Sequence, residues 1–181
     1  MTPDGYTIEE LRLEHAPALA AAYVANRQHL APWDPVRPEG FFTVTGQETA
    51  VLGQLAAVDR GTAFAWLLVR GEEVVGRVNL NNVVQGVFRS AHAGYWVAAA
   101  HVGQGLATTA VRYACDQGRA HGLHRVEAGT LVHNTASQRV LERSGFTRIG
   151  LAPSYLFIGG RWQDHVLFQR ILHDDPPTTR P

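Results

Sequence analysis

A short segment near the middle of the chain separates a run of strand-like sequence from a long helical pattern. It reads Val97-Ala98-Ala99-Ala100-His101-Val102-Gly103-Gln104-Gly105-Leu106-Ala107-Thr108. Glycine adopts backbone conformations that other residues avoid, and the first amides of a helix have no partner within the helix. The segment therefore predicts a tight turn from a strand into a helix, whose amides can bind an anion such as a diphosphate.

The order of patterns on either side of this turn limits the architecture. Strand patterns cover residues 6–13, 63–70, 74–84, 91–99, 125–132, 146–158 and 162–171, and helical patterns cover 14–26, 47–60, 105–120 and 135–144. Short connections within 63–99 indicate antiparallel hairpins, whereas helix 105–120 indicates a right-handed crossover between two parallel strands. We expect one α+β (mixed α/β) domain over residues 1–172, with a central, mixed, mostly antiparallel sheet and helices on both faces. The proline-rich residues 173–181 are expected to form a disordered tail.

The composition excludes several classes of protein. The 181 residues carry 16 basic and 16 acidic side chains, and every basic one is arginine. Without lysine there is no Schiff-base nucleophile and no P-loop, and a balanced charge gives no reason to expect nucleic-acid or membrane binding. The single cysteine, Cys115, lies on an apolar helical stripe and is expected to be buried, and the nine histidines show no ligand spacing for a metal. We expect a soluble, cytoplasmic protein.

A second pattern follows strand 125–132, at the start of helix 135–144. Asn134 precedes this helix and Ser137 lies one turn into it. Asparagine is a preferred helix cap, and that structural role alone accounts for Asn134. If strands 91–99 and 125–132 are parallel, both side chains also lie near the carboxyl ends of the pair, where a ligand of the glycine turn would lie.

Together these motifs resemble the GNAT superfamily of acyl-CoA-dependent N-acetyltransferases. The likeness lies in Gly103-Gln104-Gly105-Leu106-Ala107, in Asn134 with Ser137, and in Val140-Leu141-Glu142-Arg143-Ser144-Gly145-Phe146. Other segments resemble the RimJ-like members of the Rim-type ribosomal-protein-alanine N-acetyltransferases: Asn26-Arg27, Leu30-x-Pro32-Trp33-x-Pro35-Val36-Arg37, Asn79-x-x-Asn82, Gly94-Tyr95, and Tyr155-Leu156 up to Asp164-His165. The similarity extends from about Tyr6 to Phe168. Val102 departs from the arginine or glutamine that many members carry at that position.

This resemblance implies acetyl-CoA as the cosubstrate and no metal. Backbone groups of Val97, Ala98 and Ala99 would pair with the pantetheine arm. The diphosphate would be held by amides of Val102, Gly103, Gln104, Gly105, Leu106, Ala107 and Thr108. Asn134 would contact the pantetheine, and Ser137 would lie near the thioester sulfur and protonate the departing thiolate. On the acceptor side the resemblance implies substrate contacts from Trp33, Arg37, Asn79 and Tyr155.

The expected reaction is direct attack of a protein N-terminal α-amine, such as that of a ribosomal protein, on acetyl-CoA in a ternary complex. Such an amine has a pKa of about 7.7–8.0, against about 10.4 for lysine, so part of it is neutral near pH 7 and a water relay can serve as the base. The sequence does not choose among Glu127, His133, Tyr155, Asp164 and His165 for this role. Acetylation of a small amine (an amino acid, a polyamine or an antibiotic), a catalytically silent acyl-CoA-binding module and a homodimer stay open.

Overall fold

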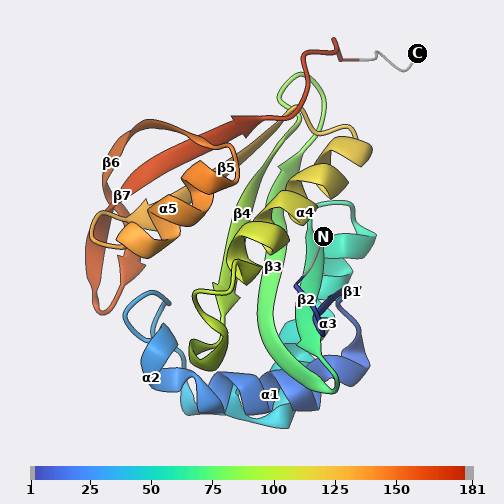
Figure 1. The fold of residues 1–181 in the computed structure, drawn as a ribbon, viewed down its shortest axis with the longest axis vertical. Helices are drawn as coiled ribbons and strands as arrows, with labels where there is room; N and C mark the ends of the chain where they lie inside the picture. The colour runs from blue at the N-terminus through green and yellow to red at the C-terminus, as the bar shows by residue number, and fades with distance from the viewer. Residues whose placement is uncertain (1–2, 178–181) are drawn as a thin grey trace.

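The computed structural model describes residues 3–177, which contain one seven-stranded sheet (Figure 1). Its strands are β1 (Thr7–Glu10), β2 (Phe64–Arg70), β3 (Glu73–Val84), β4 (Ser90–Val97), β5 (Arg125–Leu131), β6 (Thr147–Ile158) and β7 (Arg161–Ile171), in the order β1-β2-β3-β4-β5-β7-β6. The α-helices are α1 (Ala16–Ala25), α2 (Arg27–Leu30), α3 (Val44–Asp59), α4 (Leu106–Ala120) and α5 (Thr135–Arg143). Short 3-10 helices are η1 (Leu13–His15), η2 (Glu39–Phe42) and η3 (Ala99–His101).

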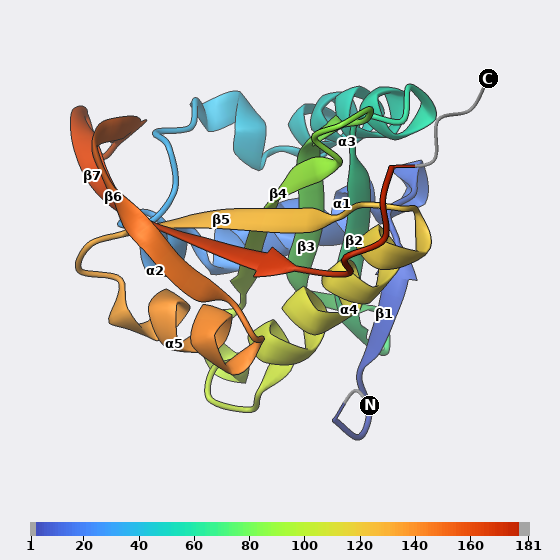
Figure 2. The same cartoon turned by 90° about the horizontal axis from the view of Figure 1, so that it is seen from above.

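Helices cover both faces of the sheet, with α3 on one side and α4 and α5 on the other (Figure 2). Leu19 of α1 and Val51 of α3 share one buried cluster with Leu67 of β2. Leu106 of α4 and Leu141 of α5 belong to a second buried cluster on the opposite face. Alternate residues of β2 enter the two clusters, which is the pattern of a strand between two helical layers.

The central strands β4 and β5 are parallel and separate after a short contact. Their pairing ends at His92 with Glu127, although β4 continues to Val97 and β5 to Leu131. Helix α4 makes the crossover that parallel neighbours require. Beyond the paired residues, β5, β6 and β7 turn away from the first four strands (Figures 1 and 2). The space between the carboxyl ends of these two strands is called the β4–β5 gap below.

The fold expected from the sequence is confirmed, including the single parallel pair and its crossover helix. Local details differ from expectation: the strand expected over residues 91–99 ends at Val97 before η3, and the helix expected over 47–60 begins at Val44. The strand expected over residues 6–13 ends at Glu10, because the Arg12 amide donates to His15 Nδ1 and the chain turns into η1. Residues 27–30, which the patterns left unassigned, form the short helix α2.

The expected disordered tail, residues 173–181, is only partly described. Residues 173–177 form no regular secondary structure, and His173 is held because its carbonyl accepts a hydrogen bond from His124 Nδ1 at 2.7 Å. Residues 178–181 lie outside the described residues. The division into a domain over 1–172 and a disordered tail therefore stays a prediction.

Candidate active site

The turn between β4 and α4 forms around two glycines with a left-handed backbone. Gly103 and Gly105 both have a φ of +79°, and Gly105 is the N-cap of α4. No side chain of the described residues caps this helix, and the space that a Cβ of either glycine would enter is open. The first-turn amides, which begin at Leu106, are therefore available to an anion, as the glycine pattern predicted.

Side chains beneath the turn hold it from inside the protein. The Tyr6 hydroxyl donates to Gln104 Oε1 at 2.8 Å and lies 2.9 Å from His101 Nδ1. Because a phenol has one proton, His101 Nδ1 is the donor to the phenol oxygen in this arrangement. His101 is buried, and its Nε2 lies 3.7 Å from the Glu73 carboxylate. Side chains thus help to fix the shape of the turn, and the two glycines leave backbone accessible on its outer side.

Backbone groups of β4 point into the β4–β5 gap. The Ala98 amide donates to the Val75 carbonyl of β3 at 2.8 Å. In an antiparallel ladder, the backbone N–H and C=O groups of one residue bond to the partner strand, and those of the next residue point away from it. The backbones of Tyr95 and Val97 therefore point away from β3, toward the gap.

The edge of β5 has the matching arrangement. The Leu172 amide donates to the His124 carbonyl at 2.8 Å, so the same alternation directs the backbones of Gly129 and Leu131 away from β7 and toward the gap. The described β4–β5 ladder stops before these residues. The two edges can therefore pair with an extended ligand that carries amide groups.

Asn134 and Ser137 meet at the start of α5, beside the gap. The Ser137 amide donates to Asn134 Oδ1 at 3.1 Å, so Asn134 caps the helix. Ser137 Oγ lies 2.8 Å and the Ser137 carbonyl 3.2 Å from the hydroxyl of Tyr95 on β4, whose single proton can go to either oxygen. Burial raises the pKa of Tyr95 to about 12, so this phenol stays protonated at neutral pH.

A cavity of about 370 Å³ lies among α1, residues 30–41, α3 and the strands β3 and β4. Three of the four residues expected to contact the acceptor line this main cavity, namely Trp33, Arg37 and Asn79. The Trp33 ring lies 5.5 Å from the ring of His133, and Arg37 Nε donates to Asp34 at 3.0 Å. The structure thus brings together residues that are distant in the sequence.

Tyr155, the fourth expected contact, lines a separate cavity of about 20 Å³ together with His92 and Glu127. Glu127, a candidate base, lies 3.0 Å from His92 Nε2 and 2.8 Å from an Arg125 guanidinium nitrogen. The Glu127 carboxylate is therefore already engaged by two neighbouring side chains.

The other candidate bases are also engaged. Asp164 Oδ1 accepts from the Ser154 amide at 2.9 Å, and the buried His165 has its Nδ1 3.0 Å from the Gln163 carbonyl. His133 packs on Trp33 at the edge of the main cavity. None of these contacts points to one side chain as the base.

Sequence reasoning assigned no role in the site to three side chains that position it. One is Tyr95, whose place on the α4 face of β4 follows from strand alternation. The others are Asn26, whose Oδ1 accepts from the Ala99 amide at 2.8 Å, and His29, whose Nε2 donates to the Val97 carbonyl at 3.2 Å. These two anchors tie the α1–α2 segment to the end of β4.

Other reactive groups lie away from the gap. Cys115 is buried as expected, and burial raises its pKa to about 11, so it is a neutral thiol. Within residues 3–177 no three metal-ligating side chains gather. In that same range, no helix combines the length and the apolar character needed to cross a bilayer.

Comparison with known proteins gives matches that cover both sides of the gap. A family model described as an acetyltransferase (GNAT) domain matches residues 6–147. The chain is 36% identical over 174 residues to the ribosomal protein uS5-alanine N-acetyltransferase of Escherichia coli strain K12, covering 92% of this chain and 88% of that protein.

Two solved structures extend this comparison. The ribosomal-protein-S5-alanine acetyltransferase of Vibrio fischeri has a TM-score of 0.91 and 31% identity, covering 96% of this chain and 97% of that one. Mycobacterium smegmatis RimJ, solved in complex with CoA-disulfide, has a TM-score of 0.87 and 33% identity, with 92% and 81% covered.

Proposed function

The chain belongs to the GNAT acetyltransferase family, and from this premise we propose that it transfers the acetyl group of acetyl-CoA to the N-terminal α-amine of a ribosomal protein. Family membership also confirms the resemblance inferred from the motifs. The observation that carries the proposal is the β4–β5 gap, which has the glycine turn at one end and Ser137 with Tyr95 beside it. The relatives named above, from E. coli and V. fischeri, are named for the alanine of one ribosomal protein, and we take such an alanine as the acceptor residue.

The residues at the glycine turn fit the diphosphate of CoA. The left-handed Gly103 and Gly105 leave open space at the turn, and the α4 amides that follow from Leu106 add the positive end of a helix. The Gln104 amide oxygen accepts from Tyr6, which leaves its side-chain NH₂ as a donor. Diphosphate binding at Val102 to Thr108 is assigned mainly to backbone groups.

The edges of the gap fit the pantetheine arm, whose two amide groups resemble those of a peptide strand. Of the β4 segment expected to pair with it, Ala98 N–H already donates to Val75, and Ala99 N–H to Asn26. The N–H of Val97 points into the gap, so it is the group we assign to this arm. Asn134, whose Oδ1 caps α5, has its side-chain NH₂ left for a second contact.

Acetyl-CoA supplies an acyl group activated as a thioester. During transfer the amine nitrogen bonds to the acetyl carbon, the C–S bond breaks, and the sulfur needs a proton. Ser137 Oγ is placed to donate that proton, the protonated Tyr95 phenol can replace it through their 2.8 Å contact, and a proton from water then restores the phenol. The proton lost by the amine leaves through water, because the carboxylate of Glu127 is held by two cationic or donor groups.

The test measures thiol release from acetyl-CoA and locates the acetyl group by mass spectrometry. Acceptors are a peptide that begins with alanine, the same peptide with a blocked α-amine, and a panel of small amines. We expect acetylation of the free α-amine only. Turnover of small amines without peptides would overturn the acceptor assignment, and CoA binding without any thiol release would overturn the catalytic role.

A further inference from the structure

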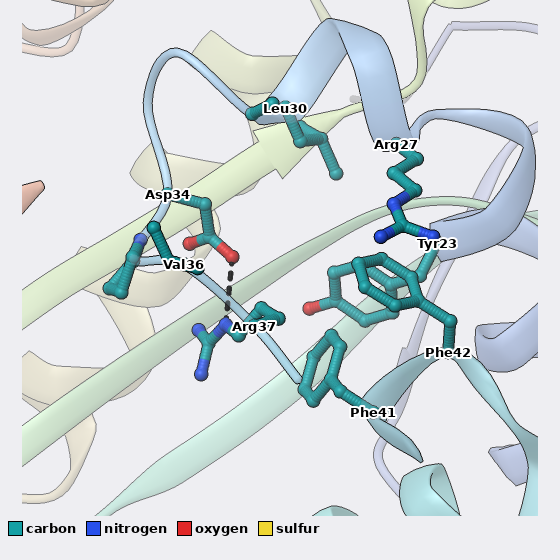
Figure 3. Close-up of a pocket in the computed structure, with 10 residues that line it drawn as sticks. Tyr23, Arg27, Leu30, Asp34, Val36, Arg37, Phe41 and Phe42 are labelled. Atoms are coloured by element: carbon teal, nitrogen blue, oxygen red, sulfur yellow. Dashed lines mark hydrogen bonds and ion pairs between the residues drawn. The ribbon is translucent and has the colours of Figure 1, made fainter. Parts of the chain in front are cut away.

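A second cavity opens beside the main one, and we call it the side pocket. It has a volume of about 180 Å³ and is lined entirely by residues between Tyr23 and Phe42 (Figure 3). The segment closes on itself, because the Arg27 guanidinium of α2 forms an ion pair with Glu39 of η2. The side pocket is therefore formed by the segment's own contacts.

The walls of the side pocket are apolar. Leu30, Val36, Phe41 and Phe42 surround it, and the Tyr23 ring closes one side (Figure 3). These side chains favour burial of another apolar group, at roughly 25 cal/mol for each Å² removed from water.

The charged groups at the rim are already paired. Arg27 lies 4.2 Å from the centre of the Phe42 ring and is bonded to Glu39. Arg37 lies 4.7 Å from the centre of the Phe41 ring and is bonded to Asp34. Each of these charges already has a partner of opposite charge, so the rim offers less to a charged side chain than the walls offer to an apolar one.

The size of the side pocket limits what it can hold. Pockets for whole drug-sized ligands span about 300–1,000 Å³, whereas a cavity of about 150 Å³ holds a benzene ring. A volume of about 180 Å³ suits one leucine, isoleucine or phenylalanine side chain.

The side pocket adjoins the main cavity, because Tyr23, Leu30, Asp34, Arg37 and Phe41 line both. The main cavity extends from these shared residues to Gly94 and Trp96 on β4. A peptide whose amine approaches β4 would therefore pass the opening of the side pocket.

From these observations we propose that the side pocket binds one apolar side chain of the acceptor, located within the few residues behind the acetylated one. This inference rests on the proposed function and adds a sequence preference to it. The enzyme then discriminates among N-termini by an apolar residue as well as by the amine.

The test compares peptides that begin with alanine and carry a single leucine, phenylalanine or glutamate at position two, three or four, against an all-alanine body. At one position, leucine or phenylalanine is expected to raise kcat/KM about tenfold over alanine, mainly by lowering KM, and glutamate is not. The variant Ala31→Phe fills the side pocket, because Ala31 lines it and is absent from the lining of the main cavity. With this variant, kcat/KM for the leucine peptide is expected to equal that for the alanine peptide.

Val24→Phe is the matched control, because it adds the same ring at an exposed α1 position outside both cavities. It should keep the wild-type ratio, and thermal unfolding verifies that both variants fold. Equal kcat/KM for all peptides, a preference for glutamate, or a leucine preference that survives Ala31→Phe would each overturn the inference while leaving the proposed function intact. Absence of turnover with every peptide would overturn the proposed function itself.

Discussion

The two sides of the β4–β5 gap present different chemical groups, backbone on one side and side chains on the other. On the side proposed for the cosubstrate, the turn before α4 presents backbone amides and is held by the hydrogen bond between Tyr6 and Gln104. On the acceptor side, the cavities are walled by side chains, among them Trp33 and Arg37. A backbone cradle suits a ligand that never changes, whereas a side-chain wall can be altered residue by residue for different acceptors. The predictions that follow test this division.

The largest effect is expected where the two sides meet. Ser137→Ala removes the proposed proton donor to the thiolate, and kcat should fall about 100-fold, the lower range of general acid catalysis. The Kd of CoA, measured by calorimetry, should change little because the diphosphate contacts are elsewhere. Ser144→Ala is the control, because it removes a hydroxyl bonded to the Val140 carbonyl at the other end of α5. An unchanged kcat would exclude Ser137 from the reaction.

A somewhat smaller effect is expected from a side chain placed in the backbone cradle. Gly105→Val forces a β-branched residue into a φ of +79° and fills the open space at the helix start, so CoA should bind at least about tenfold more weakly. Gly86→Val provides the comparison, because Gly86 has a φ of +75° in the β3–β4 connection. If both variants weaken CoA binding equally, the effect is general destabilisation.

Tyr95→Phe keeps the ring and removes the hydroxyl bonded to Ser137, so kcat should fall about tenfold. Tyr113→Phe, which alters a ring packed on Trp66, should leave kcat unchanged.

Since the pKa of Tyr95 is raised to about 12, the protonated form is favoured by folding. Its contribution to stability is present below about pH 10 and lost as pH rises toward 12, so kcat of the wild type should not fall up to about pH 10.

Arg37→Ala changes only the side-chain lining of the cavities on the proposed acceptor side. Its ion pair with Asp34 is partly exposed and worth about 1 kcal/mol or less, so we expect a rise in KM for the peptide of about threefold to fivefold. The KM for acetyl-CoA should stay constant. Arg12→Ala, which removes the exposed pair with Glu14, is expected to change neither value. A parallel rise in both KM values would contradict the separation of the two sides.

The smallest effect is expected at Cys115, which supports α4 without facing either ligand. Burial raises its pKa to about 11, so iodoacetamide at pH 8 should leave the folded protein unlabelled and fully active. Cys115→Ala should cost about 1 kcal/mol in the free energy of unfolding and leave kcat unchanged. Loss of activity together with labelling would show that this thiol is accessible.

Local features of the site could be predicted from the sequence. The positive φ of Gly103 and Gly105 and the capping by Asn134 depend on residues within one turn of each other, and the structure has both. The strands were predicted from their own patterns of apolar residues, and the antiparallel and parallel pairings from the lengths of the connections and the crossover helix.

Contacts between distant segments could not be predicted in the same way. The bond from Asn26 to Ala99 joins residues 73 apart, and the pair of Tyr95 and Ser137 spans 42 residues. The resemblance placed Trp33 and Arg37 at the acceptor side, and both line the main cavity. Tyr155 instead lines the small cavity, on a strand whose register with β7 shifts between Ala152 and Leu156.

The two anchors of the α1–α2 segment have a consequence for how such proteins diversify. Asn26 and His29 bind the amide of Ala99 and the carbonyl of Val97, which are backbone groups that every residue except proline provides. Substitutions other than proline at positions 97 and 99 therefore preserve the anchoring points, and substitutions between His29 and Phe41 leave both anchors in place. The segment that lines the cavities can thus change its composition during evolution while it stays attached to β4, the strand proposed to bind the cosubstrate.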